Sequence, residues 1–185
     1  MEALSDTEQP QGILLVAREP LDPEEAFGRL RLRRVLLLDG VQDPGNAGTL
    51  IRAADAFGLD AVLALDGTVD PFNPKVVRAS AGAVANIPVL RRSWSDVKAR
   101  LSQDGIALLV GDAGGRSVRK VQPPRPWALA VGNEGRGPRK EIQEEASEVL
   151  AVPMRQGANS LNAGVAGAIL LFALAHEPDD GRGDA

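Results

Sequence analysis

Side chains that could do chemistry gather in three stretches of this 185-residue chain, each directly after an apolar run that predicts a strand. The first stretch is Leu38–Gly48, in which Asp43–Asn46 is a turn sequence and Asn46 can cap the helix that follows. That helix carries Gly48 and Arg52 on the side opposite Leu50, so the guanidinium can point out of the core. Arginine is a good planar partner for phosphate, and the alternative is a solvated arginine on an amphipathic helix.

The second stretch, Gly132–Pro138, places three glycines and Glu134 between an apolar strand and a helix. Glycine lets the backbone approach a ligand closely, as in nucleotide sites, and a flexible turn is the alternative. A carboxylate fixed among glycines is hard to dismiss as a surface charge, so Glu134 is a candidate site residue. The stretch is not GxGxxG and lies late in the chain, which excludes a Rossmann dehydrogenase.

The third stretch, Val152–Gly164, is a polar loop in which Ser160 or Asn162 opens the last helix. Backbone N–H groups at a helix N-terminus can bind a ligand, and simple N-capping by Ser160 is the alternative reading. The helix beyond is rich in glycine and alanine. Small residues let this helix pack closely, either against the chain itself or against a second subunit.

Composition excludes several other classes of site. The chain has no cysteine, so disulfide scaffolds, zinc ribbons, thiol nucleophiles and iron–sulfur clusters are excluded. Its one histidine is His176, which argues against a serine triad or a multi-histidine metal site, and we expect no metal. Aromatic residues make up 3% of the chain, too few for a base-stacking sheet. The net charge of −4 lacks the global basic charge of a strong nucleic-acid binder.

Strands alternate with helices along the chain, which predicts an α/β fold with a mostly parallel sheet and helices on both faces. In such sheets a ligand binds beyond the carboxyl ends of the strands. The expected strands are Val35–Leu38, Ala61–Leu65, Ile87–Leu90, Ile106–Val110, Trp127–Val131 and Val149–Val152. The expected helices are Asn46–Phe57, Pro74–Ala81, Ser95–Leu101, Arg139–Ala146 and Leu161–Ala175.

The predicted organisation is one domain over residues 35–176, a lead over 1–34 and a polar tail over 177–185. The lead contains a short predicted strand, Gly12–Ala17, and a predicted linker, Arg18–Gly28. No apolar run approaches the roughly 18 residues that span a membrane. Met1–Pro10 is polar and does not read as a signal peptide, so we expect a cytoplasmic protein.

Together the three stretches resemble the SpoU/TrmH family of the SPOUT superfamily, RNA ribose 2′-O-methyltransferases. The resemblance covers residues 35–175. It is carried by motifs that occur in family order at Asp43–Gly58, Arg78–Ala83, Gly132–Gly137, Val152–Met154 and Ser160–Asn162. Each motif alone is weak, and all of them together are a strong signal.

The resemblance implies a parallel sheet whose C-terminal part forms a deep trefoil knot. It also implies a homodimer, S-adenosylmethionine as cofactor, and methylation of a ribose 2′-hydroxyl in tRNA or rRNA. The catalytic residue it implies is Arg52, with Asn46, Glu134, Ser160 and Asn162 around the reacting centre. The cofactor residues it implies are Gly132, Asn133, Glu134, Gly135, Val152, Met154, Ser160, Leu161 and Asn162. We expect Gly132→Val to block cofactor binding and to leave the fold intact.

The sequence departs from the family pattern in two places. Many members carry an N-terminal RNA-binding domain, for which the 34 residues before Val35 are too short. Asn133 stands where the family has alanine or serine.

Two questions of mechanism and class stay open at this point. Arg52 acts either as the base that takes the hydroxyl proton, or as a cation that binds the adjacent phosphate and makes the hydroxyl more acidic. The alternatives in function are a non-catalytic RNA-binding protein of the same fold and a SPOUT enzyme that methylates a base. The pair of Asn46 and Arg52 favours ribose.

Overall fold

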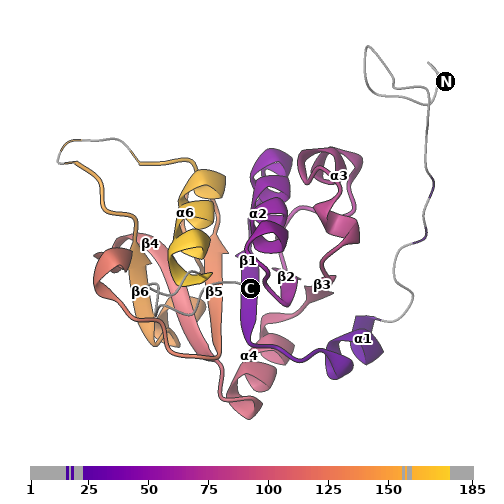
Figure 1. Ribbon diagram of the computed structural model, residues 1–185, viewed down its shortest axis with the longest axis horizontal. Coiled ribbons are helices and arrows are strands. Elements are labelled where there is room, and N and C mark those ends of the chain that lie inside the picture. Colours follow the sequence, from indigo (N-terminus) through magenta and orange to yellow (C-terminus); the bar gives the residue numbers. More distant parts are fainter. Residues whose placement is uncertain (1–15, 17, 19–22, 156, 158–159, 176–185) are drawn as a thin grey trace, which may run out of the picture.

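The structure is a computed structural model, and it describes residues 16, 18, 23–155, 157 and 160–175. Helices and strands alternate along this part of the chain (Figure 1). In order they are α1 (Pro23–Arg29), β1 (Arg34–Asp39), α2 (Pro44–Ala56), β2 (Ala61–Leu65), α3 (Pro74–Ala79), η2 (Ala83–Ala85), β3 (Val89–Arg92), α4 (Trp94–Gln103), β4 (Ala107–Ser117), η3 (Val118–Lys120), β5 (Trp127–Gly132), α5 (Lys140–Glu144), β6 (Glu148–Ala151) and α6 (Ala163–Ala175).

The six strands form one sheet in the order β3-β2-β1-β5-β4-β6, and all neighbouring strands are parallel. The predicted parallel α/β sheet is therefore confirmed. From β1 the chain builds outward through β2 and β3, then crosses to the other side of the sheet. The order thus changes direction between β1 and β5, which places a crevice beyond their carboxyl ends, where ligands bind in open α/β sheets.

Helices cover both faces of the sheet, and the side chains of β1 alternate between the two cores that result. Leu36 and Leu38 lie in one core cluster, and Val35 and Leu37 lie in the other, because successive side chains of a strand point to opposite faces. The first cluster contains side chains of α2, α3 and α6. The second contains side chains of α4 and α5. In Figure 1, α2 and α6 lie side by side on the same face.

The helix that carries Arg52 begins at Pro44, two residues before the predicted start. Asp43, and not Asn46, provides its cap, because Asp43 Oδ1 accepts a hydrogen bond of 2.7 Å from the backbone N–H of Asn46. The prediction that Gly48 shares the outward side of this helix is also wrong. A Cβ atom on Gly48 would meet Ala79 of α3, so this side of α2 is a packing face.

The segment predicted as a linker, Arg18–Gly28, contains most of a helix, α1. The ring of Phe27 lies under two guanidinium groups, 4.8 Å from that of Arg92 and 5.3 Å from that of Arg100. Arg100 also donates hydrogen bonds to the backbone oxygens of Phe27 and Leu30, at 2.8 and 2.7 Å. These contacts attach the segment to α4, so residues 23–34 pack against the domain.

Strand β4 is longer than the predicted Ile106–Val110. Its added half contains three glycines, and the pairing with β6 shifts register between Gly111 and Arg116. A Cβ atom on Gly115 would lie 2.7 Å from the backbone of Val149, which explains why glycine is needed for this close approach. Short apolar runs define strands in a sequence, so this glycine-rich half gave no signal.

Some predictions fall on residues that the structure does not describe. The predicted strand Gly12–Ala17, the tail 177–185 and His176 lie outside, apart from Val16. The chain that leads from β6 to α6 includes residues 156, 158 and 159, which are also outside, so the trefoil knot stays a prediction. Within the described residues, no helix is both long enough and apolar enough to cross a membrane.

Candidate active site

Asn46 links two loops, the first loop between β1 and α2 (residues 40–43) and the second loop between β5 and α5 (residues 133–139). It lies in the first turn of α2, it is 6% exposed, and its side-chain amide donates a hydrogen bond of 3.0 Å to Glu134 Oε1. Glu134 belongs to the loop after β5, and α2 follows the loop after β1. Since β1 and β5 are neighbours in the sheet, this bond spans the crevice at their carboxyl ends.

Glu134 also holds the backbone of the first loop. Its carboxylate accepts hydrogen bonds from the N–H groups of Gln42, at 3.3 Å, and Asp43, at 3.1 Å. Partial burial raises the pKa of Glu134, but these bonds and the one from Asn46 outweigh it and hold the pKa below its ordinary value. The carboxylate is thus ionised near neutral pH, and it fixes the start of α2 relative to the second loop.

Asn133 gives the second loop its shape. Its Oδ1 accepts hydrogen bonds from the N–H groups of Gly135, at 3.0 Å, and Arg136, at 3.2 Å, and its Nδ2 donates to the Gly40 oxygen at 3.0 Å. The backbones of Asn133 and Gly137 close the loop with two further hydrogen bonds. Neither alanine nor serine could make the bond to Gly40, so the departure at this position adds a contact to the site.

Gly132 is confined by the same loop. A Cβ atom there would collide with the backbone of Gly137 and Pro138. The expectation that Gly132→Val leaves the fold intact is therefore wrong, because the valine would force the loop itself to move.

The pair of Asp39 and Arg139 anchors the far end of the second loop, and no motif in the sequence predicts it. Asp39 ends β1 and is 1% exposed. Its carboxylate accepts hydrogen bonds from the Arg139 backbone N–H at 2.6 Å and from the Arg139 Nε at 2.5 Å. An acidic residue that ends an otherwise apolar strand was the signal available in the sequence.

The third loop, residues 152–162, leads into α6, and the first turn of α6 lies beside the start of α2. Asn162 caps this helix, since its Oδ1 accepts a hydrogen bond of 3.1 Å from the Val165 N–H. Either Ser160 or Asn162 was expected to begin this helix, and Asn162 is the residue that caps it. A Cβ atom on Gly164 would lie 3.1 Å from Asn46 Oδ1, so the first turn of α6 passes directly beside Asn46.

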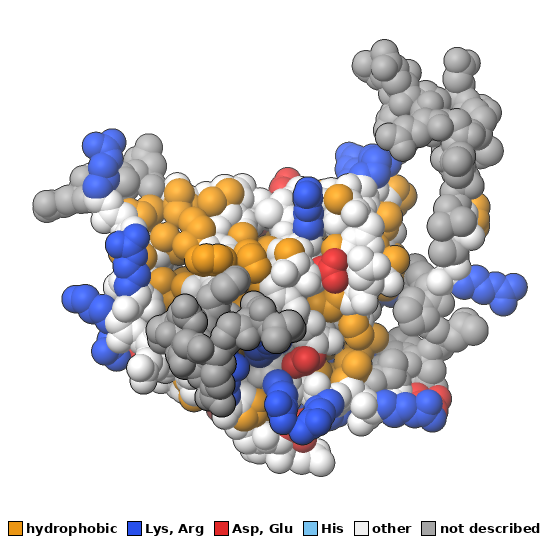
Figure 2. Space-filling model, viewed as in Figure 1, with side chains coloured by type: hydrophobic (Ala, Val, Ile, Leu, Met, Phe, Trp, Pro, Cys, Tyr) orange, Lys and Arg blue, Asp and Glu red, His pale blue; other side chains and the backbone are white. Residues whose placement is uncertain are grey.

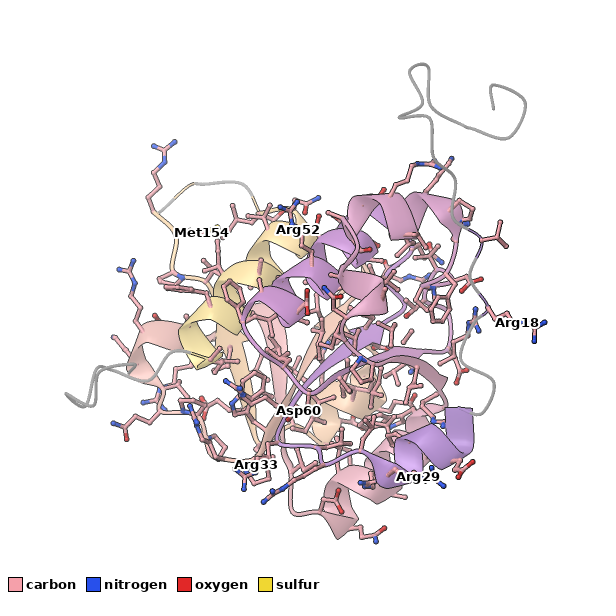
Figure 3. The ribbon with its side chains drawn as sticks, turned by 45° about the vertical axis from the view of Figure 1, so that its right-hand side comes forward. Arg18, Arg29, Arg33, Arg52, Asp60 and Met154 are labelled. Carbon is pink, nitrogen blue, oxygen red and sulfur yellow. The ribbon has the colours of Figure 1, made fainter. Side chains whose placement is uncertain are left out.

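Several of the other predicted site residues are accessible to a ligand. Arg52 is exposed, and among the described residues its guanidinium has no hydrogen-bond or ion-pair partner. Ser160 and Asn162 are exposed too, and Leu161 and Met154 are 39% and 41% exposed. Figure 3 shows Arg52 and Met154 at the same end of the molecule. The described residues contain no group of three potential metal ligands.

The chain is similar in sequence and in fold to known proteins. The model of the SpoU rRNA Methylase family matches residues 33–172. The chain belongs to the SpoU rRNA Methylase family. The family predicted from the three stretches is thus confirmed, and the matched range contains all the site residues described above.

Two relatives of the chain are named as methyltransferases of 23S rRNA. The chain is 42% identical over 174 residues to 23S rRNA (guanosine(2553)-2′-O)-methyltransferase RlmP of Bacillus subtilis, covering 93% of this chain and 68% of that protein. It is 32% identical over 145 residues to 23S rRNA (guanosine-2′-O-)-methyltransferase RlmB of Yersinia pestis, covering 77% of this chain and 59% of that protein. The chain thus spans about three fifths to two thirds of the length of these relatives.

Solved SpoU structures share the fold. The SpoU methyltransferase AviRb from Streptomyces viridochromogenes has a TM-score of 0.78 at 27% identity, covering 85% of this chain and 64% of that one. An rRNA methyltransferase from Sinorhizobium meliloti, solved with AdoMet bound, has a TM-score of 0.71 at 34% identity, covering 76% of this chain and 54% of that one.

Proposed function

We propose that this SpoU family member transfers a methyl group from S-adenosylmethionine to a ribose 2′-hydroxyl of RNA. The observation that carries the proposal is the hydrogen bond between Asn46 and Glu134, which holds α2, the helix of Arg52, against the second loop. The relatives named above, which act on guanosine 2′-O positions of 23S rRNA, support ribosomal RNA as the substrate class. We place the methyltransferase domain at residues 35–176, after the lead over 1–34.

The three loops fit S-adenosylmethionine in their chemistry. The second loop offers backbone C=O groups that can accept hydrogen bonds, and Met154 and Leu161 offer exposed apolar surface for a purine. When bound, the cofactor supplies an electrophilic methyl group on a positively charged sulfur. The residues that hold it in this proposal are Gly132, Asn133, Glu134, Gly135, Val152, Met154, Ser160, Leu161 and Asn162.

Arg52 acts on the RNA in this proposal. A guanidinium does not give up its proton readily, which disfavours the role of base. Its charge and planar donors suit a phosphate, and it is exposed without a partner among the described residues. Arg52 therefore binds the phosphate beside the target ribose and orients the 2′-hydroxyl, and its charge makes this hydroxyl more acidic. Solvent water takes the proton as the 2′-oxygen bonds to the methyl carbon and the carbon–sulfur bond breaks to leave a neutral thioether. Asn46, Ser160 and Asn162 lie around the same centre.

The experiment that tests this function is methylation of RNA with labelled S-adenosylmethionine, followed by nucleoside analysis. Label in a 2′-O-methyl nucleoside is the expected result. Label in a base would make the chain a base methyltransferase. RNA binding without any transfer of label, under conditions where an active family member transfers it, would favour the non-catalytic binding protein.

We also propose that the chain acts as a homodimer through the outer face of α6. Val165, Ile169 and Phe172 are 45%, 38% and 53% exposed and follow one another at helical spacing. Figure 2 shows hydrophobic side chains gathered over α6. Such a contiguous apolar patch is typical of an interface, and a second copy of this face would cover it in a two-fold arrangement.

Light scattering at micromolar concentration tests the dimer, and Phe172→Glu is the matched variant. The wild type should have about twice the 19.4 kDa mass of one chain, and the variant should be monomeric. A monomeric wild type would contradict the proposal.

A further inference from the structure

A cleft lined by arginines lies at the end of the sheet opposite the candidate active site. The cavity has a volume of about 860 Å³, and five arginines and two aspartates contribute to its walls. We call it the arginine cleft and define it by Arg31, Arg33, Arg34, Arg100 and Arg125. Strands β1 and β5 begin at Arg34 and Trp127, so the cleft lies at the amino edge of the sheet.

The two carboxylates of the cleft already accept hydrogen bonds within the protein. Asp60 accepts hydrogen bonds of 2.7 Å from the backbone N–H groups of both Arg33 and Arg34. Asp104 accepts one of 2.6 Å from Arg100 Nε. These carboxylates therefore hold the walls of the cleft in place. Their two negative charges stand against five guanidinium groups, so the cleft as a whole is positive.

Two guanidinium groups of the cleft remain without a partner. Arg31 and Arg33 are exposed, and among the described residues neither side chain makes a hydrogen bond or an ion pair. In a chain of net charge −4, two such groups beside one cavity form a local positive site. Planar guanidinium donors at such a site fit the oxygens of a phosphate group.

The backbone that carries these two arginines is fixed. Leu32, between them, is 5% exposed and belongs to the core beneath the sheet. The backbone oxygen of Arg33 accepts a hydrogen bond of 2.8 Å from the Trp127 N–H, and that of Arg34 accepts one of 2.9 Å from the Asp60 N–H. The site is thus built on the sheet, and only the two side chains must be ordered when an anion binds.

The cleft is too far from Arg52 to act in the chemical step. Strand β1 has six residues between the two edges, which corresponds to about 17 Å. Figure 3 shows Arg33 and Asp60 at the end of the molecule opposite Arg52 and Met154. A ligand that reaches both ends must be long and must carry repeated anionic groups, as an RNA backbone does.

We infer that the arginine cleft binds a backbone phosphate of the substrate RNA at a distance from the methylated ribose. This inference rests on the proposed function for the identity of the ligand. Contacts of this kind position a nucleic acid and add affinity without reading its sequence. The cleft therefore contributes affinity for RNA, which the net negative charge of the whole chain does not provide.

The test compares the wild type with the double variant Arg31→Ala/Arg33→Ala in the full chain. The probe is unmodified 23S rRNA transcribed in vitro, bound over a series of salt concentrations. We expect the affinity at low salt to fall on the order of 10-fold, and the slope of log K against log[salt] to become shallower by about 0.7–0.9 for each lost phosphate contact. Cofactor affinity and thermal unfolding should not change, since both side chains are exposed and unpartnered.

The matched control is Lys98→Ala/Lys140→Ala, which removes the same number of positive charges from exposed ion pairs with Glu145 and Glu144. RNA affinity of this control should stay within about two-fold of the wild type. An equal loss in both double variants would overturn the inference, because it would show a non-specific effect of net charge. Unchanged RNA binding in the arginine variant would overturn it as well.

A second measurement separates RNA from a small anion. If pyrophosphate stabilises the wild type but not the arginine variant, while RNA binding is equal, the cleft holds a free anion and the inference is wrong. Methyl transfer is measured in parallel. A wild type that transfers no methyl group, but needs Arg31 and Arg33 to bind RNA, would contradict the proposed function and support the cleft.

Discussion

The side-chain amide of Asn46 donates a hydrogen bond of 3.0 Å to the carboxylate of Glu134, 88 positions further along the chain. The same carboxylate accepts from the backbone at Gln42 and Asp43. One side chain thus fixes the position of the Arg52 helix relative to the loop that we propose binds the cofactor. A substitution at Glu134 should therefore affect the placement of both substrates.

Glu134→Gln tests this link. Glutamine keeps the size, but its amide nitrogen faces N–H donors, so at least one hydrogen bond is lost. We expect the free energy of unfolding to fall by about 1 kcal/mol, a modest loss because the side chain is partly exposed, and methyl transfer to fall on the order of 10-fold or more. Thermal unfolding and methylation rate are the measurements. Glu144→Gln, in an exposed ion pair, is the control and should match the wild type in both.

The pH dependence of stability tests the charge of Glu134. Its folded pKa lies below the ordinary value of 4.5, because hydrogen bonds outweigh partial burial. The unfolded chain therefore binds the proton more tightly, and the stabilisation from this carboxylate is fully present above pH 4.5 and is lost as the pH falls through the folded pKa. The difference in stability between wild type and Glu134→Gln should shrink below pH 4.5. A difference that grows on acidification would show the opposite sign of shift.

Arg52→Ala should abolish most turnover and leave the protein stable. The loss expected for a group that stabilises the transition state by its charge is on the order of 10²–10³-fold. The free energy of unfolding should change by less than about 0.5 kcal/mol, because the guanidinium is exposed without a partner among the described residues. Methylation rate, calorimetric cofactor affinity and thermal unfolding check these points.

Arg52→Lys separates charge from shape at the same position. Lysine retains the charge without the planar donors, so partial activity indicates a role of charge alone, and none indicates bidentate binding. A wild-type rate in Arg52→Ala would mean that the solvated-surface reading is correct.

Asp39→Asn should loosen the second loop at its end next to α5. Asn keeps the shape but loses the charge that pairs with Arg139, and one of its two polar atoms becomes a donor facing a donor. We expect a loss of about 2–3 kcal/mol in the free energy of unfolding. Urea denaturation measures it, and calorimetry should show weaker binding of the cofactor. Asp96→Asn, at the exposed start of α4, is a control expected to have a much smaller effect.

Gly48→Ala should destabilise the fold although alanine favours helices. The added methyl group would meet the backbone of Ala79, at 2.8 Å, and of Ser80, at 2.9 Å, so α2 and α3 must move apart. Such overpacking costs about 1–3 kcal/mol. Gly28→Ala in α1 is the matched control, since nothing lies within 4 Å of its new methyl group. Equal thermal stability of the two variants would contradict the packing argument.

The sequence predicted the sheet, the order of its elements and the three loops, because apolar runs and turn residues are local signals. The strand Ala61–Leu65 and the start of a helix at Pro74 agree with the structure residue for residue. It did not predict the glycine-rich half of β4 or the position of Phe27 between two arginines. These depend on contacts between distant segments, which leave no periodic pattern.

The site residues also divide into those that the sequence predicted and those that it did not. Asn46, Arg52, Glu134 and Asn162 were selected from motifs, and the structure brings Asn46, Glu134 and the start of α6 together. What the motifs could not reveal is the partner of each side chain. Asp39 and Arg139 belong to no recognised motif, and their pairing follows from the register of β1 and β5.

The place of β5 in the sheet has a consequence for the order of folding. Strand β1 pairs with β2, and β2 with β3, between residues 26 and 27 positions apart, but the second neighbour of β1 is β5, whose residues pair with those of β1 at a separation of 93 positions. Asp43 and Glu134, which meet across this junction, are 91 positions apart. Contacts at such separation form slowly, so the candidate active site is assembled late, when β5 inserts beside β1. Until then the nascent chain exposes an unpaired strand edge, the feature most prone to wrong pairing with other chains.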